Sequence, residues 1–166
     1  HQHFMLVPTL TVAENVALGT QSTRRPFTDL DVVSRRVSEI SEKHGLAVDP
    51  SVEVRRLAVG ERQRVEIIKA LYRDAELLVL DEPTAVLTPG EVDDLFVILR
   101  RMANDGRGLI FISHKLREVL TLSDRITVLR NGKVVGTTAP AETSREELAQ
   151  MMVGRAVRLT PDKPLM

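Results

Sequence analysis

The sequence predicts an α/β fold with a parallel central sheet, and three observations support this prediction. Two short apolar segments, residues 77–80 and 109–112, are each followed by polar residues, as expected of buried strands. Between them, a helical pattern begins near Pro89 and ends near Asn104. A strand, a helix and a second strand at this separation fit a right-handed βαβ unit. We expect the first strand to be buried on both faces, as in a parallel sheet covered by helices.

Polar side chains follow both predicted strands. The first strand ends in Asp81 and Glu82, and the second is followed by Ser113 and His114. Because ligands of open α/β sheets bind beyond the carboxyl ends of the strands, these residues are candidates for a site at one edge of the sheet. Taken alone, the acidic pair is also typical of a loop start or a helix cap, and a single histidine of a structural residue. The delivery of Asp, Glu and His to one edge favours a site.

The composition is that of an ordinary globular protein. The 166 residues allow one domain, or one domain and part of a second. The formal net charge is zero and the isoelectric point is near 7.1, so the overall charge does not indicate nucleic-acid binding. The sequence contains no cysteine, which excludes disulfides and thiolate metal sites. We expect neither a membrane-spanning helix nor a secretory signal.

A mostly helical segment is predicted from about residue 9 to residue 56. Thr11 and Glu14 have the spacing of a capping box, so a helix is expected to begin there. Residues 29–44 carry apolar side chains at helical spacing, and Gly45 is placed to end that helix. We expect these apolar residues to pack in a core.

A short loop at residues 57–61, with the sequence LAVGE, leads into the next helical pattern. The spacing of Val65, Ile68 and Leu71 predicts a helix from Gly60 onward. Free backbone N–H groups at a helix start bind anions, so this loop is a candidate phosphate site. The pattern fits a simple helix start equally well.

The last third of the chain predicts a hairpin and a final helix. Residues 125–130 read as a strand, and Asn131 and Gly132 are typical of a tight turn that returns through residues 133–136. Residues 143–147 have the pattern of a helix cap.

The order of these segments resembles the nucleotide-binding domain of ATP-binding cassette (ABC) transporters. Residues 57–61 resemble the signature loop, residues 77–82 the Walker B strand, and residues 85–88 the D-loop. His114 resembles the switch histidine and Gln2 the Q-loop glutamine. Several ordered motifs over nearly the whole chain make chance a poor explanation.

The resemblance implies a fold and a division of the chain. The fold is an α/β, P-loop NTPase-like (RecA-like) core with a parallel sheet, incomplete, with an ABC helical subdomain and a C-terminal β-hairpin. The implied division is a Q-loop segment at 1–8, a helical subdomain with the signature helix at 9–72, the RecA-like core at 73–153, and a linker or tail at 154–166.

The resemblance also implies ATP and Mg²⁺ as cofactors, with the protein acting by positioning and charge. Asp81 would hold Mg²⁺ through water, and Gln2 would sense the metal and the water. Glu82 would act as the general base, and His114 would contact the γ-phosphate. The loop ending at Gly60 would bind the γ-phosphate of a nucleotide held by a second cassette. The nucleotide-binding residues so implied are Gln2, Leu57, Ala58, Val59, Gly60, Glu61, Asp81 and Thr88.

Two positions depart from the family pattern. Ala58 stands where the signature loop usually has serine, so a hydroxyl donor to the γ-phosphate is missing. A charge-assisted hydrogen bond of this kind is worth about 1.5–3 kcal/mol. Thr88 ends the D-loop where aspartate is usual. These departures concern the γ-phosphate contact and the communication between two nucleotide sites.

The sequence has no Gly-x-x-x-x-Gly-Lys-Ser/Thr loop, which supplies the phosphate cradle in this family. The one Gly-Lys pair, Gly132 and Lys133, lacks the required flanking residues and belongs to the predicted hairpin. We expect that the chain begins just after that loop, and that the isolated chain is inactive and binds ATP weakly or not at all.

The sequences of residues 3–8, 111–116 and 152–155 are similar to those in the first cassette of the double-cassette ATPases that drive simple-sugar and nucleoside importers. The implied function is an ATP-hydrolysing importer subunit, peripheral on the cytoplasmic face of the membrane. The implied partners are transmembrane permease subunits, a second cassette and, indirectly, a solute-binding protein, with no nucleic acid. Self-association through exposed sheet edges is also expected. The alternatives are a non-transport ABC protein of translation or repair, and a non-catalytic interaction fragment.

Overall fold

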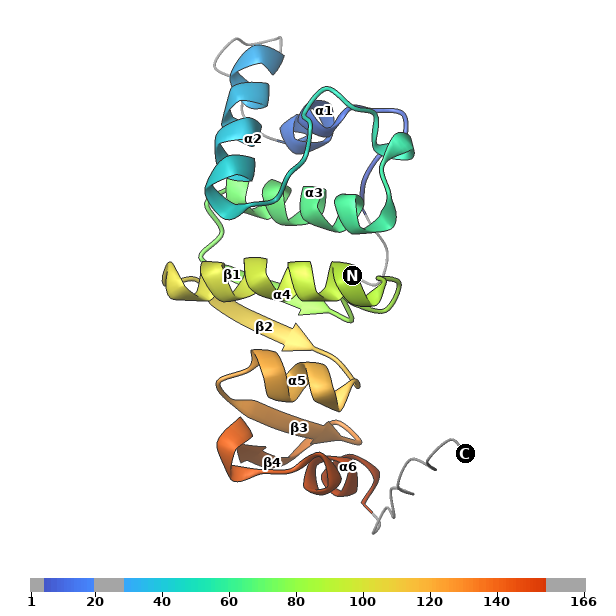
Figure 1. Cartoon of the computed structure of the whole chain (residues 1–166), viewed down its shortest axis with the longest axis vertical. Coiled ribbons are helices and arrows are strands. Elements are labelled where there is room, and N and C mark those ends of the chain that lie inside the picture. The colour runs from blue at the N-terminus through green and yellow to red at the C-terminus, as the bar shows by residue number, and fades with distance from the viewer. Residues whose placement is uncertain (1–4, 20–28, 155–166) are drawn as a thin grey trace, which may run out of the picture. The chain divides into compact units, whose positions relative to one another are not determined.

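The computed structural model describes residues 5–19 and 29–154 (Figure 1). Gln2 and the predicted tail after residue 154 lie outside the described residues. The chain divides into two compact units between Ile112 and Ser113, and each unit is described by itself. The elements of the first unit are α1 (Val12–Ala17), α2 (Leu30–His44), the 3₁₀ helix η1 (Val54–Arg56), α3 (Val59–Tyr72), β1 (Leu77–Asp81), α4 (Pro89–Asn104) and β2 (Gly108–Ile112). Those of the second are α5 (Leu116–Leu122), β3 (Ile126–Arg130), β4 (Lys133–Thr138), the 3₁₀ helix η2 (Pro140–Glu142) and α6 (Arg145–Val153).

Helices α1, α2 and α3 pack together around an apolar core, as the sequence predicts (Figure 1). Val12, Val16, Val37 and Ile68 are fully buried in it. The Thr11 capping box is confirmed at the start of α1, since the Glu14 N–H donates to the Thr11 hydroxyl and the Glu14 carboxylate accepts from the Thr11 N–H. Gly45 ends α2 in the left-handed region, with φ of 69°, as predicted.

Asn15 on α1 organises the segment that precedes this helix. Its side chain is fully buried and accepts a hydrogen bond from the Val7 N–H at 2.7 Å. Its amide nitrogen lies within hydrogen-bond distance of three carbonyl oxygens, those of Val7 at 3.1 Å, Leu10 at 3.2 Å and Thr11 at 2.9 Å. A single buried amide therefore satisfies the polar backbone of a loop that has no regular structure.

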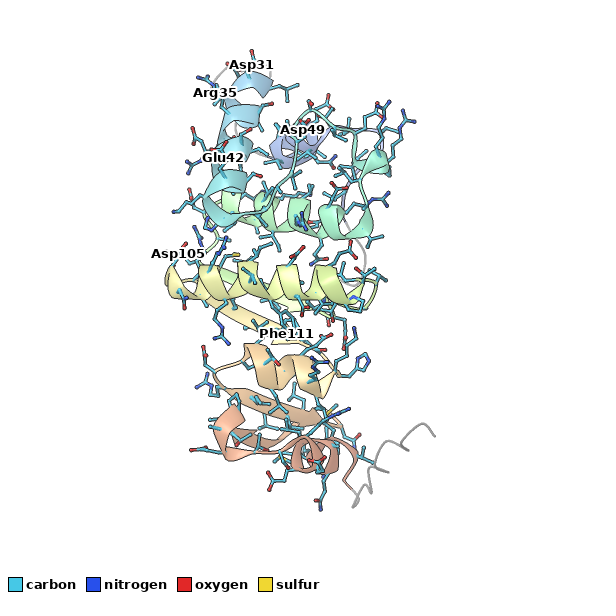
Figure 2. The ribbon with its side chains drawn as sticks, in the orientation of Figure 1. Asp31, Arg35, Glu42, Asp49, Asp105 and Phe111 are labelled. Atoms are coloured by element: carbon cyan, nitrogen blue, oxygen red, sulfur yellow. The ribbon has the colours of Figure 1, made fainter. Side chains whose placement is uncertain are left out.

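His44 at the end of α2 is another buried polar residue, with 3% of its surface exposed. Its Nδ1 lies 3.8 Å from a carboxylate oxygen of Asp105, which follows α4, and has no hydrogen-bond partner among the described residues. Figure 2 labels Asp105 at that end of α4. Burial lowers the pKa of His44, and the nearby Lys43 and Arg107 lower it further, whereas Asp105 raises it. The imidazole is therefore neutral in the folded protein at neutral pH.

Strands β1 and β2 pair in parallel, with Leu77 opposite Gly108 and Asp81 opposite Ile112. Helix α4 connects them and packs on β2, which confirms the predicted βαβ unit. The rings of Phe96 on α4 and Phe111 on β2 meet edge to face, with centroids 6.0 Å apart. Figure 2 labels Phe111.

The expectation that β1 is buried on both faces is wrong. Leu78 is 4% exposed, but Leu77 and Val79, which lie on the opposite face, are 55% and 56% exposed. Ile110 and Ile112 on β2 are exposed to a similar degree. The physical reason is that α4 covers one face of the pair and nothing in the described part of the chain covers the other.

The second unit contains the predicted hairpin. Strands β3 and β4 pair antiparallel, and Asn131 and Gly132 form the turn with φ of 51° and 73°. The core of this unit is Ile126, Val128 and Leu148, against which residues of α5 and α6 pack. Ser144 and Glu147 form the capping box of α6. Among the described residues of both units, no helix has the length and hydropathy needed to cross a bilayer.

Replacing Asn15 tests its role in holding the preceding loop. We expect Asn15→Ala to lower the free energy of unfolding by about 1–3 kcal/mol, because it removes a buried amide and leaves the Val7 N–H without its acceptor. The measurement is denaturant unfolding. Asn104→Ala, at an exposed helical asparagine, is the matched control and should change stability by less than about 0.5 kcal/mol. Equal effects of the two substitutions would contradict this role.

The burial of His44 predicts a dependence of stability on pH. The folded pKa lies below the ordinary value of 6.5, so the unfolded chain binds more protons as the pH falls through that value. The free energy of unfolding should therefore decrease from about pH 7 toward pH 5 and level off below the folded pKa. Unfolding measured at several pH values should show a smaller slope in His44→Gln. An unchanged slope in this variant would assign the effect to other groups.

Candidate functional site

Asp81 and Glu82 are consecutive residues where β1 ends. Asp81 is the last residue of the strand, and the Glu82 N–H donates to the Ile112 carbonyl at 2.9 Å, so pairing with β2 continues one residue further. Glu82 then adopts a left-handed backbone with φ of 48°. A non-glycine residue in this region costs about 1–3 kcal/mol, and such strain is concentrated at functional sites.

A tight turn follows and keeps the two carboxylates at the strand end. The Glu82 carbonyl accepts from the Ala85 N–H at 3.1 Å, and Thr84 is fully buried beneath the turn. Asp81 and Glu82 are each half-buried, and the Oε2 atom of Glu82 is itself buried. The predicted placement of the acidic pair at the carboxyl end of a parallel strand is thus present.

Thr88 occupies the start of α4. Its hydroxyl accepts from the Glu91 N–H at 3.4 Å, and the Glu91 carboxylate accepts from both the N–H and the hydroxyl of Thr88, at 2.9 Å and 2.8 Å. This is a complete capping box, with Pro89 at the first helical position. Thr88, which the resemblance places in the D-loop, is therefore the N-cap of the helix that follows.

Residues 57–61, which the resemblance identifies as the signature loop, form the start of α3. Leu57 and Gly60 are buried, whereas Ala58 and Val59 are exposed. Ala58 is the N-cap with an extended backbone, and its N–H donates to the Glu61 carboxylate at 2.7 Å. Alanine has no side-chain oxygen to accept the reciprocal hydrogen bond from the Glu61 N–H, so only half of a capping box is made. The helix start predicted at this loop is confirmed; its use as a phosphate site stays a prediction.

Helix α4 approaches this loop through two acidic side chains. The Gly60 N–H and the Arg64 guanidinium both help to lower the pKa of Glu91, although the two hydrogen bonds from Thr88 are the larger causes. Arg64 also forms an ion pair with Asp94, one helical turn further on, at 3.4 Å. Glu91 was not among the residues predicted for the site, although the Thr-x-x-Glu spacing of its capping box is visible in the sequence.

Helix α3 also binds the backbone of Met5, which lies three residues after Gln2. The Met5 N–H donates to the Glu66 carboxylate at 2.7 Å, and Lys69 donates to the Met5 carbonyl at 3.1 Å. Both side chains belong to α3, so the helix that begins at the signature loop also holds Met5. Gln2 itself lies outside the described residues. His114 is exposed and belongs to the second unit, so its place beside Glu82 stays a prediction.

The donor set at β1 fits a nucleotide-bound magnesium ion. Mg²⁺ is usually held by one or two carboxylates together with phosphate oxygens and water. Asp81 supplies one carboxylate at the end of β1, which fits this kind of coordination.

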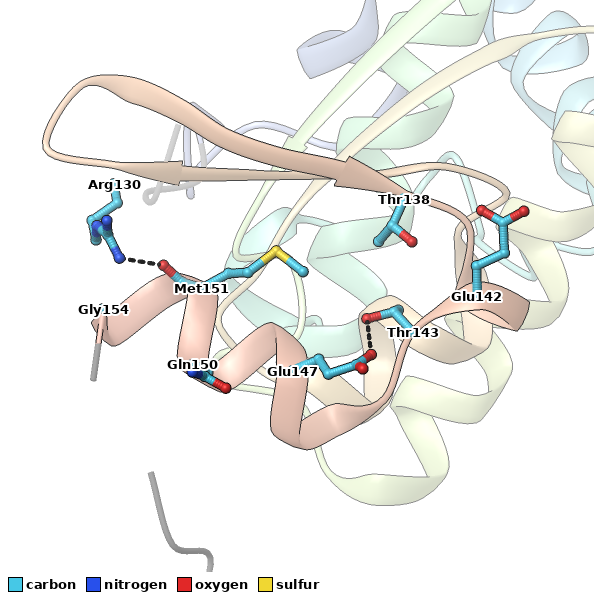
Figure 3. A pocket seen from close by; sticks show the side chains of 8 residues that line it. All are labelled: Arg130, Thr138, Glu142, Thr143, Glu147, Gln150, Met151 and Gly154. Carbon is cyan, nitrogen blue, oxygen red and sulfur yellow. Dashed lines mark hydrogen bonds between the residues drawn. The ribbon is translucent and has the colours of Figure 1, made fainter. Parts of the chain in front are cut away.

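A separate cavity lies in the second unit, between the hairpin and α6 (Figure 3). Arg130 donates to the Met151 carbonyl at 2.9 Å, and Thr143 donates to Glu147 at 3.1 Å. These bonds tie α6 to the hairpin and close its first turn. None of the residues predicted for nucleotide binding lines this cavity.

Comparison with solved structures supports the fold. The structure of cbiO1 from Clostridium perfringens, part of the ABC transporter complex cbiONQ, matches with a TM-score of 0.69 at 25% identity. The match covers 90% of this chain and 57% of that one. The predicted P-loop NTPase-like fold is thereby confirmed.

Comparison with known sequences extends over almost all of the chain. The glucose import ATP-binding protein TsgD13 of Haloferax volcanii is 48% identical over 98% of this chain and 35% of its own length. The nucleoside import ATP-binding protein NupA of Lactococcus lactis is 45% identical over 98% of this chain and 32% of its own length. The chain thus spans about a third of the length of these relatives. The family model described as ABC transporter matches residues 1–85, about half of the 166 residues, and the chain belongs to the ABC transporter family.

Proposed function

We propose that the whole protein is the ATP-hydrolysing subunit of an importer for simple sugars or nucleosides. The observation that carries this proposal is the pair of adjacent carboxylates, Asp81 and Glu82, at the end of a parallel strand. The printed names of the similar proteins, which concern glucose and nucleoside import, support the substrate class. The working form would be peripheral on the cytoplasmic face of the membrane, bound to permease subunits and to a second cassette.

Each residue has a role that fits its place. When bound with ATP, Mg²⁺ would neutralise charge on the phosphate oxygens. Asp81 would hold this ion through water, because its carboxylate stands at the carboxyl end of β1, where ligands of parallel sheets bind. Glu82, one residue further and turned by its left-handed backbone, would accept the proton of the attacking water. Gln2 and His114 would complete the site, one beside the metal and the other at the γ-phosphate.

The signature loop would act on a nucleotide held by the second cassette. The backbone N–H groups at the start of α3 would face the γ-phosphate, as helix starts do in other phosphate sites. Ala58 offers no hydroxyl there, so the contact relies on the backbone and on the helix dipole. Hydrolysis would therefore need two cassettes.

Glu82→Gln tests the role of the general base. The substitution keeps the size of the side chain but removes its ability to take a proton, so we expect ATP hydrolysis by the whole protein to fall about 10²- to 10⁴-fold. ATP binding should persist, which a nucleotide titration measures. Glu76→Gln, at an exposed glutamate just before β1, is the matched control and should hydrolyse ATP normally. A Glu82→Gln variant with the wild-type rate would exclude Glu82 as the base.

Ala58→Ser tests whether the signature loop faces a phosphate. The added hydroxyl can donate one charge-assisted hydrogen bond, so we expect kcat/KM for ATP to rise about tenfold. Val97→Thr adds a hydroxyl at an exposed position of α4, outside the residues predicted to bind nucleotide, and should leave kcat/KM unchanged. A stability gain in Ala58→Ser without any change in kcat/KM would mean that the hydroxyl only caps α3.

A further inference from the structure

The backbone of Gly60 does not explain why this position is glycine. Gly60 lies within α3 and is absent from the glycines that adopt a positive φ. Alanine is a better helix former than glycine. Local conformation alone would therefore favour a side chain here.

The side chain of Glu91 occupies the space beside Gly60. A Cβ atom built on Gly60 would lie 2.4 Å from Oε1 of Glu91, 2.9 Å from Cδ and 3.2 Å from Cγ. All three of the nearest atoms belong to this one side chain. Gly90, another helical glycine close to the start of its helix, has no atom within 4 Å of its built Cβ. The space beside Gly60 is filled, whereas the space beside Gly90 is open.

Glu91 serves two helix starts at once. One carboxylate oxygen, Oε2, accepts from the N–H and the hydroxyl of Thr88 at the start of α4. The Gly60 N–H at the start of α3 also acts on this carboxylate and helps to keep its pKa below the ordinary value. Ala58, the N-cap of α3, has no side-chain acceptor of its own. A residue of α4 thus supplies what the cap of α3 lacks.

We propose that Glu91 is a positioning residue that ties the signature loop to the start of α4, and that glycine at position 60 leaves the end of the Glu91 side chain its place, which an added side chain would push aside. The tie joins residues 57–61 to residues 85–88, which lead into α4. The consequence for catalysis rests on the proposed function: the two loops that would face the nucleotides keep a fixed spacing. The Arg64–Asp94 ion pair lies beside this tie, but Asp94 is 67% exposed, and exposed pairs contribute little.

A double-mutant cycle tests the contact itself. Gly60→Ala, Glu91→Ala and the double variant are compared with the wild type by denaturant unfolding. We expect Gly60→Ala to lower the ratio of folded to unfolded protein in the wild-type background and to leave it equal or raise it when Glu91 is alanine. The effect of the alanine should differ about 2- to 10-fold between the two backgrounds. Gly90→Ala is the matched control and should be neutral or stabilising in both. Equal effects of Gly60→Ala in both backgrounds would overturn the proposal.

A second measurement separates positioning from stability. Glu91→Gln keeps an acceptor for Thr88, because glutamine also completes a capping box, but it removes the charge that acts on both helix starts. We expect an unfolding midpoint close to that of the wild type and a several-fold lower kcat for ATP hydrolysis by the whole protein. Asp94→Asn should leave kcat unchanged. A wild-type kcat in Glu91→Gln would overturn the positioning role. If the wild-type protein does not hydrolyse ATP, the proposed function fails, and the unfolding cycle still decides whether the contact exists.

Discussion

The packing of α4 is the constraint on which the rest of the first unit depends. One side of this helix, with Leu95, Leu99 and Met102 buried, covers the only face of the β1–β2 pair that is covered in the described residues. Its first turn meets the start of α3 through Glu91. The same helix therefore supports the strand that carries Asp81 and Glu82 and holds the loop proposed to contact a second nucleotide. A shift of α4 would move both parts of the site together.

The elements that sequence alone predicted are those set by local chemistry. The capping spacings at Thr11 and Ser144, the left-handed glycine at position 45 and the Asn131–Gly132 turn act within a few residues of chain, and the structure contains each of them. The acidic pair at the end of β1 was also predictable, because an apolar run that stops at two carboxylates fixes where the strand ends. The exposed face of that strand was not, because burial depends on what packs against it and a continuous apolar run does not reveal how many layers cover it.

The contacts that sequence alone did not predict join residues far apart in the chain. Asn15 reaches back to Val7, His44 packs beside Asp105, and Glu66 and Lys69 on α3 hold the backbone of Met5. Each of these polar groups also has an ordinary interpretation as a surface residue of an amphipathic helix. Only the packing of the helices brings the partners together, and no spacing in the sequence encodes it. The Q-loop glutamine and the switch histidine depend on the same kind of long-range arrangement, so they stay predictions.

The contrast among the three capping glutamates shows what a local motif leaves open. Glu14 and Glu147 each serve the start of their own helix, with Thr11 and Ser144 as partners. Glu91 has the same spacing from Thr88, yet its carboxylate also lies against Gly60 of another helix. A carboxylate suits such a double role because it has two acceptor oxygens, and because the N–H groups of both helix starts favour its charged form. Gly60 identifies the second partner of Glu91. It is a helical glycine without a positive φ, and the three atoms nearest to its built Cβ all belong to the Glu91 side chain. Such a glycine indicates that one carboxylate lies between two helix starts.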